Sequence, residues 1–392
     1  MFEGGTEAMR RRDFMTCFAV GAGLSCASPP RTGGCEIPSE VAGDPPVPSE
    51  TTQVRRDGFF TLVQARGRTW LMKPDGGLFL TLGKNHIDPA SLRYPESGRI
   101  WRERYGNSMR RWLQEKVRPD LLAWGFNSVG WNQDMASNGE TNHRQSRLFT
   151  FDEYQWLDMP YAPMLPFADF HHWDAQHRMP DFSAPEFADW CDYVAREYVA
   201  PFADDPKLIG YFYVDCPTWV HTHPHSRWRG PLFDHRQLES EEGRARLTDL
   251  ATSYYRTLHD AIRRYDPHHL ILGDRYEARG RMAVEVLRAA APYIDVLSFQ
   301  HFGSIEQVIV DLNRWAETIG KSVLLADSYS GNLSLFQQVP SCIGYHACGS
   351  YVKNKVRGGA MLDSQEAPIG DSVEKAKSTN LAISAWVDSF RS

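Results

Sequence analysis

The sequence predicts a (β/α)8 barrel preceded by a short N-terminal β-hairpin. Eight short apolar runs occur between residues 78 and 346, of the kind that parallel strands covered on both faces have. Helical stretches separate the runs, and those near residues 271, 296, 324 and 344 are about 20–28 residues apart, as successive βα units are. The alternative, an open doubly wound sheet, usually carries a glycine-rich phosphate loop after its first strand. Residues 83–88 here read Gly-Lys-Asn-His-Ile-Asp, which is not such a loop.

The hairpin comes first along the chain. Residues 59–63 and 69–72 are apolar and flank a turn at Arg66 and Gly67. A second turn over residues 73–77 leads into the first barrel strand. The eight barrel strands are expected at residues 78–83, 126–131, 162–166, 208–214, 270–273, 294–299, 322–326 and 342–346.

Three helices between these strands have clear signals. Ser183 to Glu186 form a capping-box sequence, which predicts a helix with the apolar residues Phe187, Trp190, Val194 and Tyr198 at helical spacing. Residues 246–264 carry one apolar face, made of Leu247, Leu250, Tyr254, Leu258 and Ile262. A third helix is expected to begin at the cap Ser304 and to end at Gly320.

The N-terminus is typical of an export signal. Arg10, Arg11 and Arg12 precede Asp13 and Phe14, an apolar stretch covers residues 18–24, and small residues follow at 25–27. This order resembles a twin-arginine signal, so we expect a signal peptide over residues 1–27 and a periplasmic or extracellular protein. A frayed basic terminus and a lipoprotein anchor on Cys26 are the alternatives. Residues 28–55 are rich in Pro, Gly, Ser and Glu and predict a disordered linker, which leaves 56–392 for the barrel domain.

Composition excludes several classes of protein. The net charge of −6 disfavours a nucleic-acid binder, which needs a basic face. No run of about 18 apolar residues appears, so no membrane span is expected. Five cysteines follow the signal without C-x-x-C spacing, which supports neither a zinc knuckle nor a dense disulfide framework. Aromatic residues make up 12% of the chain, which suits both a large core and a cleft that stacks flat ligands.

Polar and aromatic residues follow all eight predicted strands, where the chemistry of a barrel lies. The candidates are, in chain order, Asn85, His86, Trp131, Asn132, His171, His172, Asp215, Trp219, Arg275, Glu277, His301, Asp327, Tyr329 and His346. Gln300 also follows the sixth strand. Polar residues at eight consecutive strand ends are hard to reconcile with a purely structural barrel.

The run from Leu208 to Trp219 resembles the strand-4 signature of the clan A type, (β/α)8 retaining glycoside hydrolases, and is closest to the β-agarase and β-galactosidase-like branch. Residues 180–187, 205–212, 269–276, 294–298 and 320–327 resemble other segments of that group in the same order, so the likeness covers about residues 60–365. The resemblance implies a hydrolase that cleaves glycosidic bonds in a polysaccharide or oligosaccharide, and the N-terminal signal predicts that this hydrolase is exported.

Both catalytic Glu positions of that family are altered. Pro217 stands where strand 4 carries the Glu acid/base, and Asp327 where strand 7 carries the Glu nucleophile. A carboxylate pair remains, and glycoside hydrolysis needs two. The resemblance makes Asp215 the acid and Asp327 the nucleophile or base, with Glu277 as a reserve carboxylate. Arg275 stays charged at any working pH, so we expect it to orient one of these carboxylates.

The other candidates are expected to contact substrate. His86, His301 and His346 occupy positions where the resembling family contacts sugar hydroxyls, and the rings of Trp131 and Trp219 are expected to stack on sugar faces. No cofactor or metal is expected. Two other readings stay open: a degenerate barrel that binds glycan without cleaving it, and a metal-dependent barrel hydrolase. The metal hypothesis rests on the alternate histidines at 221, 223 and 225, which could share one metal ion.

Overall fold

The computed structural model describes residues 58–94, 97, 99–135, 146–168, 182–217, 219–220, 235–278, 282–329, 331–354 and 359–390. The chain divides into two units, Met1–Thr51 and Thr52–Ser392, and all described residues belong to the second unit. The predicted signal peptide and the predicted linker therefore lie outside the described residues.

A seven-stranded parallel sheet forms the centre of the described part of the chain. Its order is β5-β4-β12-β11-β10-β9-β8, and residues 161–164 bridge its two edges. Tyr161 pairs in parallel with Val129 of β5 and with Leu208 just before β8, so the curled sheet closes in the eighth strand position. The predicted barrel is thus confirmed, although its third strand is reduced to isolated bridges. The strands are β4 (Thr81–Lys84), β5 (Ser128–Val129), β8 (Gly210–Asp215), β9 (Leu270–Glu277), β10 (Val296–Gln300), β11 (Ser322–Ser328) and β12 (Cys342–Ala347).

A small antiparallel sheet precedes the barrel. It has the order β1-β2-β3, with β1 at Thr61–Ala65, β2 at Arg68–Met72 and β3 at Leu78–Phe79. Arg66 (φ 52°) and Gly67 (φ 75°) are both left-handed, as the two central residues of a type I′ hairpin turn must be. The predicted hairpin is therefore confirmed. The predicted single strand over 78–83 is wrong, because β3 pairs with β2 whereas β4 joins the barrel.

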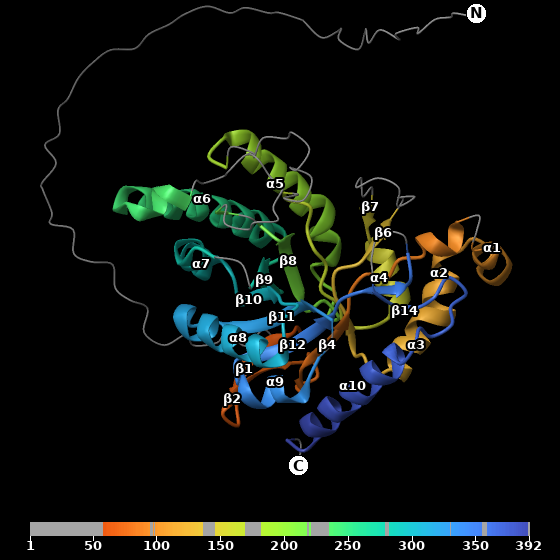
Figure 1. Ribbon diagram of the computed structural model, residues 1–392. Helices are drawn as coiled ribbons and strands as arrows, with labels where there is room; N and C mark the ends of the chain where they lie inside the picture. Colours follow the sequence, from red (N-terminus) through yellow and green to blue (C-terminus); the bar gives the residue numbers. More distant parts are fainter. Residues whose placement is uncertain are drawn as a thin grey trace, which may run out of the picture. The chain divides into compact units, whose positions relative to one another are not determined.

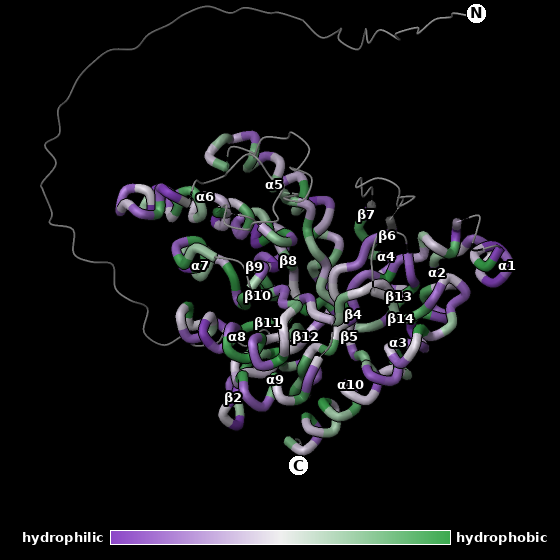
Figure 2. Tube along the Cα trace, in the orientation of Figure 1, coloured by the Kyte–Doolittle hydropathy of each residue, from purple (hydrophilic) through white to green (hydrophobic). Residues whose placement is uncertain are grey.

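Helices cover the outside of the barrel, and α5 to α9 lie around β8 to β12 in Figure 1. The helices are α1 (Ile100–Tyr105), α2 (Met109–Trp112), α3 (Arg118–Ala123), α4 (Phe151–Leu157), α5 (Pro185–Tyr198), α6 (Glu241–Tyr265), α7 (Val284–Ala290), α8 (Ile305–Ile319), α9 (Leu333–Gln338) and α10 (Ser372–Asp388). Two further strand pairs lie outside the barrel sheet: β6 (Gln133–Met135) with β7 (Ser146–Leu148), and β13 (Ser350–Val352) with β14 (Ala360–Leu362). Along α6 and α8 hydrophilic and hydrophobic residues alternate (Figure 2), as they do in helices with one face on a sheet. None of the described helices combines the length and apolarity that a membrane-spanning segment needs.

Two of the three predicted helices match the structure closely. In α8 the Ser304 hydroxyl accepts a hydrogen bond from the Gln307 backbone N–H, and Gly320 ends the helix in the left-handed conformation. In α6 the buried face includes Leu247, Tyr254 and Leu258, as predicted.

The third helix, α5, differs from the prediction at its start and in its buried face. Ala184 is the N-cap and provides no side-chain hydrogen bond, so the predicted capping box does not form. Trp190 and Tyr198 are 44% and 39% exposed, because Phe187, Cys191 and Val194 carry the face that packs on the barrel.

The barrel interior changes in character along its axis. Its N-terminal part is apolar, and Phe60, just before β1, and Leu71 of β2 pack there against barrel residues such as Leu272 and Leu324. Toward the C-terminal ends of the strands the buried residues become polar, beginning with Arg275 and Asp327. The fold therefore places a buried polar cluster where barrel enzymes carry their chemistry.

Candidate active site

A buried arginine joins the two predicted catalytic carboxylates. The Arg275 side chain is fully buried, with Nη1 3.1 Å from Asp215 Oδ1 and Nη2 3.1 Å from Asp327 Oδ2. Nη2 also donates to the Ala326 carbonyl at 3.2 Å. Two nitrogens of one guanidinium lie about 2.3 Å apart, given C–N bonds of about 1.33 Å, so the two contacted carboxylate oxygens are at most about 8.5 Å apart. The pair therefore lies within the range in which two carboxylates can act on one glycosidic bond.

The register of neighbouring strands explains this meeting. Asp215 at the end of β8 pairs with Arg275 of β9, and Gln300 at the end of β10 pairs with Asp327 of β11. Arg275 has the length to reach past β10 to Asp327. Its guanidinium also lies against the Trp131 ring, with Cζ 4.9 Å from the ring centroid, which shields it from water. The predicted orienting role of Arg275 thus has a geometric basis on both carboxylates.

Asp327 is held as an anion. The Asn85 amide donates to Oδ1 at 2.8 Å, and His86 Nε2 lies 3.5 Å from Oδ2. Burial alone would raise the pKa of the Asp327 carboxyl, but Arg275, His86 and Asn85 outweigh burial and hold that pKa well below its usual range. Asp327 is therefore equipped to act as a nucleophile or base.

Asp215 has two donors on one oxygen. The Gln300 amide and the Arg275 guanidinium both contact Oδ1, and the residue is 9% exposed. Such donors stabilise a carboxylate anion. This environment differs from the apolar pocket that usually holds a catalytic acid protonated.

The loop after β4 brings Asn85 and His86 onto Asp327. The Asn85 side-chain oxygen accepts from the Trp131 backbone N–H at 3.1 Å, which fixes the amide that contacts Asp327. His86 has a left-handed backbone (φ 57°), and its ring packs edge-on against Trp131 with centroids 5.2 Å apart. The predicted residues Asn85, His86 and Trp131 therefore lie together at the carboxylate pair.

His346 lies deeper in the barrel. Its Nε2 is 3.0 Å from the Thr81 hydroxyl, and burial, with a smaller effect of Arg275, lowers its pKa to about 3. The ring fits because Gly83 and Gly130 face it, and a Cβ at either glycine would lie 2.4 Å from a ring atom. His346 is thus a neutral, buried ring beneath the carboxylates.

Two predicted substrate contacts use their polar atoms within the protein. His301 Nε2 lies 3.0 Å from Asp311 Oδ2, and its Nδ1 accepts the Gly303 N–H at 3.0 Å. Asn132 accepts the Ile87 N–H at 2.7 Å and donates to the Gly130 carbonyl. These contacts favour a role in positioning loops over the predicted contact with sugar.

The packing of Trp219 does not favour its predicted contact with sugar. The side chain is 4% exposed, and its ring lies 5.2 Å from Tyr254, 5.8 Å from Tyr255 and 5.9 Å from Phe182. Tyr254 and Tyr255 belong to α6 on the outside of the barrel. Trp219 is therefore a core residue between the sheet and α6.

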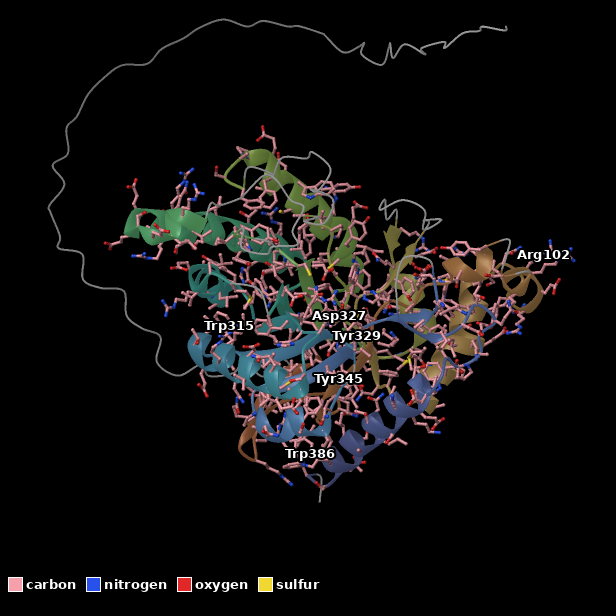
Figure 3. The ribbon with its side chains drawn as sticks, viewed as in Figure 1. Arg102, Trp315, Asp327, Tyr329, Tyr345 and Trp386 are labelled. Carbon is pink, nitrogen blue, oxygen red and sulfur yellow. The ribbon has the colours of Figure 1, made fainter. Side chains whose placement is uncertain are left out.

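Tyr329 and Glu277 lie at the rim. Tyr329 is 69% exposed, pairs with the Phe302 ring at 4.9 Å, and lies two residues beyond Asp327 (Figure 3). Glu277 is half-buried and lies two residues beyond Arg275, so both side chains share one face of β9. His171 and His172, and the histidines at 221, 223 and 225, lie outside the described residues.

Sequence reasoning missed two residues at this site. Lys84 is buried, and its ammonium donates to the carbonyls of Asn85 (2.8 Å) and Gly349 (2.6 Å), which ties together the ends of β4 and β12. Lys84 directly follows the predicted first strand, so the rule of strand ends was the available signal. Cys348, just after β12, brings its sulfur close to His86 and Asp327. Cys348 lies two residues beyond the predicted end of the eighth strand, within the span in which the rule of strand ends selected other candidates.

No protein-family model and no curated protein matches the chain. Solved structures do match: an agarase, AgWH50C, with a TM-score of 0.60 and 16% identity over 84% of this chain and 64% of that one. An exo-β-agarase gives a TM-score of 0.60 and 15% identity over 86% of this chain and 66% of that one. The chain shares the barrel fold of these glycoside hydrolases. It spans a little less than two thirds of their length. An endo-1,4-β-mannanase from Rhizomucor miehei matches with a TM-score of 0.51 and 12% identity, over 83% of this chain and 99% of that one.

Proposed function

We propose that this protein is an exported glycoside hydrolase that cleaves glycosidic bonds in a polysaccharide or oligosaccharide, with agarose and related galactans as the first substrates to test. The observation that carries the proposal is the meeting of Asp215 and Asp327 on Arg275 at the C-terminal ends of β8 and β11. The fold shared with two agarases and a mannanase supports the substrate class.

Asp327 takes the role of the ionised carboxylate. In a retaining mechanism one of its oxygens attacks the anomeric carbon, while the bond to the leaving sugar oxygen breaks. In an inverting mechanism it removes a proton from the attacking water instead. Arg275, Asn85 and His86 hold the anion in place before substrate arrives, so little reorganisation is needed in the reaction.

The leaving oxygen needs a proton, and two carboxyls compete to supply it. Asp215 is the acid that the strand position implies, but Arg275 and Gln300 stabilise its anion. Glu277 lies on the same face of β9 as Arg275, at the half-buried rim. Aryl glycosides with a good leaving group need little acid assistance, so activity on them distinguishes the carboxyl that acts as the acid from the other carboxyl. The variant that lacks the acid should keep most of its activity on an aryl glycoside and lose it on a glycan.

The test is a screen for new reducing ends on agarose, mannan and other polysaccharides, followed by Asp215→Asn, Asp327→Asn and Glu277→Gln on any substrate found. Asp327→Asn should lose activity on every substrate, whatever the leaving group. Of Asp215→Asn and Glu277→Gln, only the variant that lacks the acid should regain activity on the aryl glycoside. If all three variants keep near-normal turnover on a glycan, the carboxylates are structural and the proposal fails.

A second candidate is a barrel that binds glycan without cleaving it. The observation that favours it is the Arg275 guanidinium, which lies between Asp215 and Asp327 and pairs with both, while Pro217 stands at the position of the expected acid. Binding of a polysaccharide in affinity electrophoresis, with no reducing ends released over long incubation, would support this candidate over the hydrolase.

Export is the third part of the proposal, and its support is the sequence of residues 1–27. Replacing both Arg11 and Arg12 by lysine should abolish export of the full chain through the twin-arginine route. Unchanged export of that variant would refute the twin-arginine assignment.

A further inference from the structure

Three side chains of different chemistry converge beside the carboxylate pair. His86 follows β4, Asp327 lies in β11 and Cys348 follows β12, and one ligand atom from each lies within 4.8 Å of the others. His86 and Asp327 are buried, and Cys348 is half-buried and forms no disulfide with another described cysteine. The closed barrel therefore brings an imidazole, a carboxylate and a thiol to one point.

This set of donors suits a borderline-soft divalent cation. Zn²⁺ binds imidazole nitrogen, carboxylate oxygen and thiolate sulfur at about 2.0–2.3 Å, so ligand atoms of a tetrahedral site lie about 3.3–3.8 Å apart. His86 Nε2 and Asp327 Oδ2 are already 3.5 Å apart. Three protein ligands would leave a fourth position for water. Mg²⁺ and Ca²⁺ prefer oxygen ligands and fit this set poorly.

The backbone of His86 is the second observation. Its φ of 57° is unusual for a residue other than glycine, and strain of this kind clusters at functional sites. The conformation is held from both sides, because the His86 N–H donates to the Trp131 carbonyl and its own carbonyl accepts from Tyr351. Asn85 fixes the other oxygen of Asp327, as outer-shell groups do for metal-bound carboxylates.

Two nearby cations oppose a metal ion. Arg275 Nη2 lies 3.1 Å from the same Asp327 oxygen, and the Lys84 ammonium lies among the carbonyls of the β4 and β12 ends. A dication can bind beside them only if a further negative charge is present. The thiolate of Cys348 would supply it, so Cys348 should contribute most to affinity and should favour thiophilic ions.

We propose that His86, Asp327 and Cys348 form a binding site for a Zn²⁺-type divalent cation. The binding itself does not depend on the proposed hydrolase activity. One consequence rests on that function: an ion on Asp327 occupies the ionised carboxylate, so the ion should inhibit turnover and a chelator should restore it.

The experiment is titration of the purified full chain with Zn²⁺ in a calorimeter, together with Co²⁺ spectroscopy. We expect one ion per chain and a thiolate-to-cobalt charge-transfer band in the near ultraviolet. Cys348→Ser should abolish the band and weaken Zn²⁺ binding by at least about tenfold. Cys216→Ser is the matched control: it is also half-buried after a strand end, and it should leave both signals unchanged.

A second ligand variant keeps the test decisive if one replacement perturbs folding. His86→Asn preserves the left-handed backbone, which asparagine tolerates, and it should weaken Zn²⁺ binding while thermal melting of the apoprotein stays near wild type. Absence of Zn²⁺ binding to the wild type, or a cobalt band that survives in Cys348→Ser, would overturn the site. Zn²⁺ binding by a protein that is inactive on every glycan would support the metal site and refute the proposed hydrolase activity. An active hydrolase that Zn²⁺ neither binds nor inhibits would reject the site alone.

Discussion

Replacing Arg275 by methionine should destabilise the protein by about 3–5 kcal/mol at pH 7, because it leaves two buried carboxylates without their common partner. Asp215 and Asp327 are 9% and 4% exposed, and the guanidinium contacts each at 3.1 Å. Water therefore cannot replace the lost contacts without opening the end of the barrel. Arg314→Met is the control: Arg314 pairs with Asp311 at the same 3.1 Å, but its side chain is 55% exposed, so about 1 kcal/mol or less is expected.

The loss should also depend on pH with a definite sign. In the wild type the folded-state pKa of Asp327 lies below that of the unfolded chain, so its contribution to stability is present above about pH 4 and is lost at lower pH. Without Arg275, only His86 and Asn85 oppose the effect of burial on Asp327, so the pKa of its carboxyl rises and the protonated form is favoured. The difference in unfolding free energy between wild type and Arg275→Met should therefore be largest at neutral pH and should narrow as the pH falls toward 4.

Urea unfolding followed by tryptophan fluorescence at pH 7 and pH 4 measures both effects. Adding Asp215→Asn and Asp327→Asn to Arg275→Met removes the unpaired charges and should recover much of the stability. If Arg275→Met does not fold, Arg275→Lys keeps the charge without the planar fork, and it should fold with lower stability and impaired turnover. A loss below about 1 kcal/mol at pH 7, or the same loss at both pH values, would refute the ion-pair account.

Three other residues give measurable predictions. Burial, only partly offset by donors such as the Tyr255 hydroxyl, raises the pKa of Asp274 to about 7, so the folded protein keeps a proton that the unfolded chain loses above about pH 4. The free energy of unfolding of the wild type should thus fall between about pH 4 and 7. Asp274→Asn should remove this pH dependence and should be more stable than the wild type at pH 8 by up to about 4 kcal/mol. The same pH dependence of the unfolding free energy in both proteins, measured by urea unfolding, would contradict this prediction. Trp219→Ala should lower the free energy of unfolding by about 3–5 kcal/mol without changing glycan affinity. A loss of glycan affinity in a variant as stable as the wild type would instead show that Trp219 contacts the glycan. The His346 ring should stay neutral at pH 5 in NMR, and a titration midpoint near pH 6.5 would show that it is not buried as described.

The barrel could be predicted because its strands are short, apolar and regularly spaced. Seven predicted strands correspond to paired strands, and residues 161–164 hold the eighth position through bridges. The exception at residues 78–83 has a local cause: Leu80 separates β3, which pairs backward with β2, from β4, and an apolar run does not reveal a change of partner.

The sequence predicted which residues follow the strands of the barrel, but not which way their side chains point or which contacts they make. The rule that chemistry follows the strands identified Asp215, Arg275 and Asp327 correctly as neighbours. It left the direction of Trp219 open, because a residue after a strand can turn toward the mouth or toward the outer helices, and its side-chain direction depends on Tyr254 and Tyr255, more than 30 residues away. That Arg275 contacts both carboxylates depends on strand register, which the sequence does not show.

The most direct test of the central claim is the rate of glycan cleavage by Asp327→Asn, measured beside wild type and Arg314→Met on the substrate found in the reducing-end screen. Asn keeps the size of the side chain and removes only the charge that the reaction needs. We predict that turnover by Asp327→Asn falls at least about a thousandfold, as expected when a catalytic carboxylate is lost. Its far-ultraviolet circular dichroism spectrum should be unchanged, and Arg314→Met should be as active as the wild type. Turnover by Asp327→Asn within a few-fold of wild type would show that the Asp215–Arg275–Asp327 cluster is structural.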